Sequence, residues 1–104
     1  MSLQQTIENI WDNRDLLQKE ESKTAIREVI ALLDKGELRV AEPTENGWQV
    51  NEWVKKAVVM YFPIQKMETI EVGPFEFHDK IPLKKNYAEK GVRVVPHAVA
   101  REGA

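Results

Sequence analysis

The most informative stretch of the chain is GVRVVPHAVAREGA, residues 91–104. From Val95 onward, small or branched apolar residues recur at short, regular spacing, and a proline and an acid–glycine pair fall where turns are expected. This pattern is typical of a hexapeptide-repeat β-helix, in which each flat face is about six residues long and one inward aliphatic residue per face fills the core. A single rung cannot bury its own apolar face. We therefore expect residues 91–104 to open a longer solenoid and residues 1–90 to form the N-terminal domain that caps it.

Two amphipathic helices are predicted at the beginning of the chain. Apolar residues recur at helical spacing over residues 3–18, with acidic and amide residues on the opposite face. A second stripe with i, i+3, i+4, i+7 spacing follows, for which Ser22 is the expected N-cap. Gly36 follows a basic last turn and is expected to end this helix in the left-handed conformation.

A hairpin is predicted after the second helix. The turn at residues 45–47 contains Asn-Gly, which tolerates the positive φ values that a tight hairpin requires. Residues 38–41 alternate like a short strand, and residues 48–50 are the expected returning strand.

The rest of the domain is expected to contain one more helix and further strands. Asn51 can cap the helix, and Phe62 should end it, because the residue before Pro63 is biased away from the helical region. Beyond the proline, alternation of apolar and polar residues predicts strands at 68–72 and 75–78, followed by an irregular, lysine-rich stretch. The predicted class is α+β.

The composition excludes several classes of protein. The 104 residues include 15 basic and 17 acidic residues, a net charge of −2 without a polybasic stripe, which gives no reason to expect nucleic acid as a partner. The chain has no Cys and only two His, so we expect no disulfide and no metal site. It also has no GxGxxG or Walker pattern, and we expect no bound cofactor. Its first residues lack the basic and apolar regions of a signal peptide, so we expect none, and its longest apolar run, residues 57–62, is too short to span a bilayer. A cytoplasmic protein without membrane contact is expected.

Arg93 is the first candidate for a binding residue. It lies between Val92 and Val94, and in an alternating strand its guanidinium would point away from the side that the valines occupy. A planar guanidinium in that position suits a carboxylate, to which it can donate two parallel hydrogen bonds. The alternative is a surface salt bridge, the commoner role of an arginine.

The two histidines are weaker candidates. His78 and Asp79 resemble half of a catalytic dyad, but neighbours along a strand point to opposite faces, so a structural role is favoured. His97 occupies a turn of the expected rung, where it would be exposed, and a role as general base has little support.

Aromatic residues and paired lysines complete the candidates. Trp11, Trp48 and Trp53 lie on apolar stripes, which favours packing, although a Trp-bearing surface of a free-standing interaction module is the alternative. The pairs at residues 55–56 and 84–85 are two adjacent lysines each, a weak signal for an anionic ligand.

Four segments together resemble the N-terminal part of the bacterial tetrahydrodipicolinate N-succinyltransferases. They are VIALLDKGELRVAE at 29–42, WVKKAV at 53–58, FHDKIPLK at 77–84 and GVRVVP at 91–96. The resemblance implies a domain that continues into a left-handed parallel β-helix of hexapeptide repeats. It also implies an enzyme of the diaminopimelate branch of lysine biosynthesis, which transfers succinyl from succinyl-CoA, its co-substrate, to the amino group of acyclic tetrahydrodipicolinate.

The resemblance also implies how the site is shared. The family works as a homotrimer with active sites between adjacent subunits, and the arginine of its Gly-x-Arg-Val-Val-Pro motif, Arg93 here, binds substrate. The β-helix supplies the acidic active-site residue and the coenzyme A groove. We therefore expect residues 1–104 alone to be monomeric and inactive, with no catalytic residue among them. A weaker alternative is the cap of a different hexapeptide acyltransferase.

Overall fold

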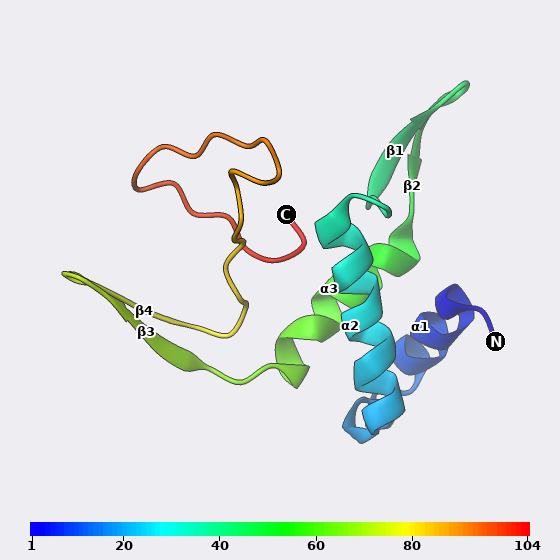
Figure 1. Cartoon of the computed structure of the whole chain (residues 1–104). Coiled ribbons are helices and arrows are strands. Elements are labelled where there is room, and N and C mark those ends of the chain that lie inside the picture. Colours follow the sequence, from blue (N-terminus) through cyan, green and yellow to red (C-terminus); the bar gives the residue numbers. More distant parts are fainter.

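Three helices pack together, and two hairpins project from them in different directions (Figure 1). The structure is a computed structural model that describes all of residues 1–104. The elements are α1 (Leu3–Asp12), the 3₁₀ helix η1 (Arg14–Gln18), α2 (Glu20–Lys35), β1 (Ala41–Thr44), β2 (Gly47–Val50), α3 (Glu52–Ile64), β3 (Glu68–Val72) and β4 (Phe75–Asp79). A small domain with both helices and strands is therefore confirmed.

The first two helices differ from the prediction at their ends. The segment predicted as one helix over residues 3–18 is α1 followed by η1, because Asn13, a poor helix former, leaves the helical region with φ −135° and ψ 88°. Ser22 as the N-cap of α2 is wrong. That helix begins at Glu20, where two acidic residues suit the positive end of the helix dipole, and Ser22 is buried inside its first turns.

The other helix ends follow the sequence more closely. Gly36 is confirmed as a left-handed cap, with φ +79°. Asn51 is the N-cap of α3, but its side-chain Nδ2 donates to the carbonyl of Arg39 (2.8 Å) rather than capping the helix. Phe62 as the last helical residue is wrong, since α3 includes Pro63 and ends at Ile64. A proline in the last turn removes a single backbone hydrogen bond, which a helix end tolerates.

The core lies where the three helices meet. Ile7 of α1, Ile26 of α2 and Met60 of α3 have no exposed surface, and each contacts the same apolar cluster. Ile81, beyond β4, extends this cluster toward the C-terminal segment. The helical apolar stripes of the sequence therefore face one another, as their 3.6-residue period requires.

Both hairpins lie largely outside this core. β1 pairs with β2, but the first strand begins at Ala41 rather than at residue 38, because pairing extends backward from the tight turn between Thr44 and Gly47. The prediction for β3 and β4 is confirmed, with β4 one residue longer. Their register places Ile70 opposite Phe77 and Glu71 opposite Glu76.

The C-terminal segment contains no regular strand. Residues 91–104 consist of turns and extended backbone, and their one sheet-like contact is an antiparallel bridge between Leu83 and Arg101. The segment arches beside the β3–β4 hairpin and returns to the helices (Figure 1). The β-helix rung stays a prediction, since a lone rung has no neighbours with which to form its ladders.

Candidate functional site

Arg93 lies in a loop whose two ends are joined to each other by backbone hydrogen bonds. The amide of Lys84 donates to the carbonyl of Ala100 (2.9 Å), and the amide of Glu102 donates to the carbonyl of Pro82 (2.8 Å). These bonds flank the bridge between Leu83 and Arg101 and close residues 85–99, here called the Arg93 loop.

The closed ends are fixed to both α2 and α3. Asp34, in the last turn of α2, accepts hydrogen bonds from Lys84 Nζ (2.6 Å) and from the amide of Gly103 (2.9 Å), both to Oδ1. From α3, the hydroxyl of Tyr61 donates to Glu102 Oε1. Burial, and then the hydrogen bond to Glu102, raises the pKa of Tyr61, so the phenol stays protonated and remains the donor.

Arg93 itself is exposed and forms no ion pair with another residue of the chain. It lines a largely apolar groove together with Tyr87 and valines and alanines of residues 92–100. Lys84 and Lys90 also line the groove, and no acidic residue does. Lys84 is paired with Asp34, so Arg93 and Lys90 are the cations of this groove without an ion-pair partner, and their charge suits an anionic ligand such as a carboxylate.

The expected direction of Arg93 is not what the structure gives. Strict alternation would place its guanidinium on the side opposite to Val92 and Val94, but residues 92–95 pair with no strand, and all three side chains line the same groove. The prediction that Arg93 binds substrate does not depend on that alternation.

The histidines have separate surroundings. His78 Nδ1 lies 2.9 Å from Thr69 Oγ1 across the hairpin, while Asp79 faces Arg101, with Oδ2 3.4 Å from Nε. The prediction that His78 and Asp79 do not form a dyad is therefore confirmed. His97 is exposed at a turn with φ +74°, and its ring meets that of Phe75 edge-on at 5.7 Å between centroids.

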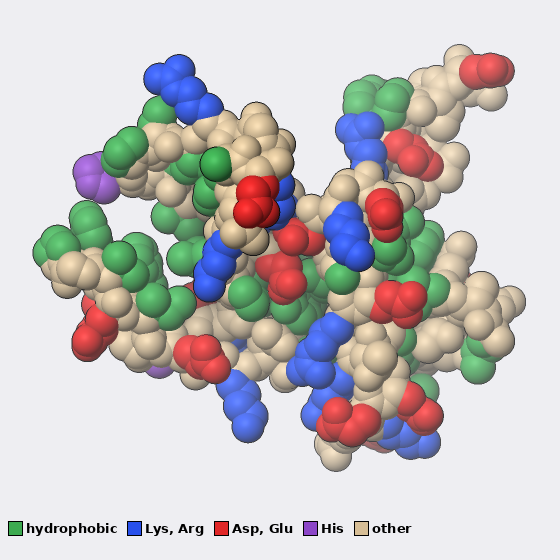
Figure 2. All heavy atoms as spheres, in the orientation of Figure 1, with side chains coloured by type: hydrophobic (Ala, Val, Ile, Leu, Met, Phe, Trp, Pro, Cys, Tyr) green, Lys and Arg blue, Asp and Glu red, His purple; other side chains and the backbone are tan.

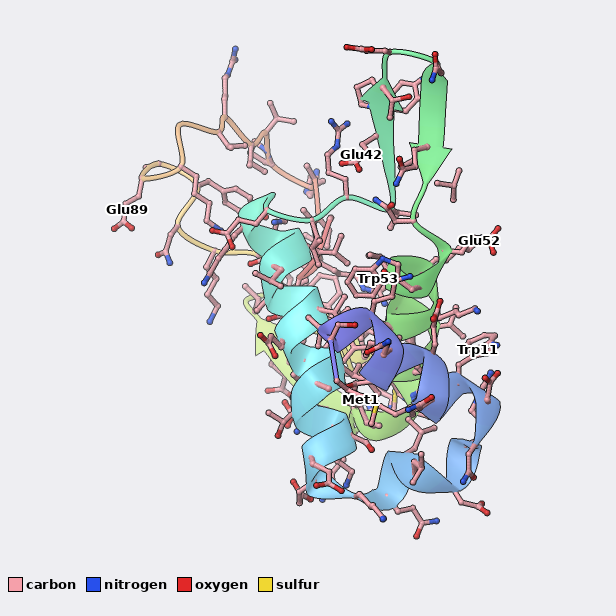
Figure 3. All side chains as sticks on the ribbon, turned by 90° about the vertical axis from the view of Figure 1, so that its right-hand side faces the viewer. Met1, Trp11, Glu42, Glu52, Trp53 and Glu89 are labelled. Atoms are coloured by element: carbon pink, nitrogen blue, oxygen red, sulfur yellow. The ribbon has the colours of Figure 1, made fainter.

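The tryptophans divide into two groups. Trp53 points from α3 toward the helices and Trp11 lies on their flank (Figure 3), and both are half-buried against the core. The prediction that Trp48 packs is wrong, because β2 projects from the domain and leaves this side chain 69% exposed.

The paired lysines do not form an anion site together. Lys56 lies over the Trp11 ring, with Nζ 5.7 Å from its centroid, while Lys55 is exposed. Lys84 is bound by Asp34, so only Lys85 of the second pair remains exposed. No three His, Asp or Glu side chains gather where they could hold a metal ion. None of the helices combines the length and the hydropathy that a membrane-spanning segment requires.

Sequence reasoning missed the group that fixes the loop. A carboxylate in the last turn of a helix is unfavourable beside the negative end of the helix dipole, so Asp34 indicates a hydrogen-bonding or cationic partner outside the helix. That signal is weak, because Asp12 is the last residue of α1 and forms no ion pair.

The pKa of Asp34 makes the stability of the domain depend on pH. The Gly103 amide, and then Lys84, lowers this pKa below its ordinary value of 3.8. A lowered folded-state pKa contributes stability that is present above the unfolded-state pKa and is lost as the pH falls through the folded-state value. We expect Asp34→Asn to lower the free energy of unfolding at neutral pH, and the difference from the unmodified chain to shrink below about pH 4.

Urea unfolding at a series of pH values measures this difference. Asp12→Asn is the matched control, since Asp12 also lies in the last turn of a helix but is exposed. Equal pH dependence of the two differences would contradict the prediction.

Residues 2–64 match the family described as tetrahydrodipicolinate N-succinyltransferase N-terminal. The chain is 46% identical, over 114 aligned residues, to 2,3,4,5-tetrahydropyridine-2,6-dicarboxylate N-succinyltransferase of Bordetella petrii, covering 100% of this chain and 42% of the relative. Relatives with the same name from Alkalilimnicola ehrlichii and Legionella pneumophila are 45% and 42% identical, over 98% and 99% of the chain and 41% of each relative. The chain thus spans less than half the length of these relatives.

Proposed function

This chain belongs to the tetrahydrodipicolinate N-succinyltransferase family, whose N-terminal domain it matches, and we propose that it is that domain of a working succinyltransferase. The enzyme moves succinyl from succinyl-CoA to the amino group of tetrahydrodipicolinate in the diaminopimelate route to lysine. The observation that carries the proposal is the end-to-end match, at 46% identity, to 42% of the length of a named relative.

In this proposal the chain contributes substrate binding rather than chemistry. The amine attacks the thioester carbon, a C–N bond forms, the C–S bond breaks, and the coenzyme A thiolate leaves while a base takes the amine proton. The substrate is a dicarboxylate, and the exposed guanidinium of Arg93, in a groove with no acidic residue, suits one of its carboxylates. The base and the thioester groove belong to the part of the enzyme beyond the match.

The same proposal accounts for the apolar surface of the C-terminal segment. Val92, Val95 and Val99 are each about half-exposed, and hydrophobic side chains gather around the hollow between this segment and the β3–β4 hairpin (Figure 2). We assign residues 91–104 to the first rung of a left-handed β-helix, whose next rung would cover these valines. The complete enzyme acts as a cytoplasmic homotrimer, and the isolated domain is monomeric and inactive.

A free-standing interaction module is not favoured. Trp11 and Trp53 are committed to packing, which leaves Trp48 as the one largely exposed tryptophan, and the chain matches a family of enzymes.

A hybrid enzyme tests the proposal. In the hybrid, residues 1–104 replace the matching part of the Bordetella petrii relative. We expect the hybrid to release coenzyme A from succinyl-CoA only when the amino-dicarboxylate is present, measured as free thiol. The control is the relative without its matching part. A hybrid that is folded and trimeric but inactive would refute the proposal, as would a coding sequence that does not continue as hexapeptide repeats after Ala104.

A further inference from the structure

We propose that Asp34 and Lys84 are positioning residues, whose ion pair fixes the Arg93 loop to α2 and so holds Arg93 in place for substrate. This inference rests on the proposed function, which it deepens by naming the groups that orient the substrate-binding arginine. Neither Asp34 nor Lys84 needs to touch substrate in this role.

The body of the Arg93 loop cannot fix its own position. Every residue from 85 to 99 is exposed except Tyr87, which is half-buried. Glu89 lies at the outer part of the loop, away from the helices (Figure 3). Long loops without secondary structure are commonly functional, and a loop with so few buried contacts takes its position from its two ends.

Both ends of the loop meet at Asp34. Lys84 directly precedes the loop and places Nζ 2.6 Å from Oδ1 of Asp34 and 3.3 Å from its backbone carbonyl oxygen. Gly103, beyond the other end, donates its amide to the same Oδ1. By contrast, the contacts of Glu102 with Tyr61 and of Arg101 with Asp79 hold one end only.

The ion pair is shielded enough to act as an anchor. The side chains of Lys84 and Asp34 are 14% and 26% exposed, whereas Glu20, paired with Lys23 on the surface of α2, is 84% exposed. Exposed pairs contribute little, but removing one partner of a shielded pair leaves the other charge without compensation. The anchor therefore depends on both residues being present.

Hydrogen exchange of the unmodified chain and its variants tests the anchor. In Asp34→Ala and Lys84→Met, we expect the backbone amides at positions 84 and 102 to exchange at least about tenfold faster after correction for intrinsic rates, because the bonds that close the loop open more often. Amides in the middle of α2 should keep their rates. Asp12→Ala and Lys85→Met are the matched controls, since each removes an exposed charge of the same kind. Unchanged exchange of the two closing amides would overturn the anchor.

Kinetics of the hybrid enzyme test the positioning role. We expect Asp34→Ala to raise KM for the amino-dicarboxylate about tenfold, to leave KM for succinyl-CoA unchanged, and to add little when Arg93→Ala is already present. Asp34→Asn, the milder change, gives a smaller increase and serves if the alanine variant does not fold. If the KM increases caused by Asp34→Ala and Arg93→Ala multiplied in the double variant, or if Asp34→Ala lowered kcat alone, the positioning role would be overturned. If the hybrid without further substitutions were inactive, the proposed function would be refuted instead. Hydrogen exchange of the chain itself would still test whether the ion pair anchors the loop.

Discussion

Replacing Arg93 by alanine in the hybrid enzyme is expected to raise KM for the amino-dicarboxylate about 10- to 100-fold, with much less change in KM for succinyl-CoA. The reason is that a hydrogen-bonded contact with a charged group contributes about 1.5–3 kcal/mol, and about 1.4 kcal/mol corresponds to a factor of ten. Arg93 forms no ion pair within the chain, so no carboxylate of the chain competes with the substrate for its guanidinium. Steady-state kinetics with each substrate varied in turn measure the effect.

Two further variants sharpen this result. Arg93→Lys keeps the charge but loses the planar fork, so its KM should lie between those of the unmodified and alanine enzymes. Arg39→Ala removes another exposed arginine, outside the groove, and should leave both KM values unchanged. Equal increases in both KM values for Arg93→Ala, or none, would remove Arg93 from the substrate site.

Ile26→Ala is expected to give the largest loss of stability of any single alanine replacement in α2. Ile26 is completely buried in the middle of the helix and belongs to the core cluster shared by all three helices. Replacing a buried isoleucine by alanine lowers the free energy of unfolding by about 2–5 kcal/mol, because apolar contacts are lost and a cavity remains. For a domain of this size, each kcal/mol lowers Tm by about 4–8 °C.

Thermal unfolding followed by circular dichroism measures this loss. Val59→Ala is the matched control, because Val59 is a branched residue in the middle of α3 but is 45% exposed. Its effect should stay within about 0.5 kcal/mol. A Tm for Ile26→Ala close to that of the control would contradict the packing described for α2.

Local patterns in the sequence predicted most of the helices and hairpins. The 3.6-residue period that places Ile26 in the core and the glycine that ends α2 at Gly36 act within a few residues, so they can be recognised without the fold. The errors lie where two local signals compete. Ser22 is a good N-cap by type, but acidic residues two positions earlier also suit a helix start, and Ser22 became buried instead.

The candidate site could be predicted only in part. Arg93 can be singled out from the residues around it, because its motif is contiguous, and its role in binding substrate stays a prediction. The ion pair that anchors the loop cannot be predicted from the sequence, because Asp34 and Lys84 are 50 residues apart. Which lysine contacts which carboxylate depends on how the C-terminal segment returns to α2. The sequence predicts that Trp48 packs because it lies on an apolar stripe, but the hairpin that carries it projects from the domain and exposes it.

The register of the β3–β4 hairpin has a consequence for how the chain behaves at high concentration. Glu71 and Glu76 are directly opposite each other, and like charges in that arrangement weaken a strand pair slightly. Both strands are sheet edges with open backbone groups, beside the exposed aromatic rings of Phe75 and Phe77. A second hairpin stacking edge-to-edge would bring more glutamates against this pair. We expect these glutamates to weaken the hairpin slightly and to oppose its edge-to-edge pairing with other copies.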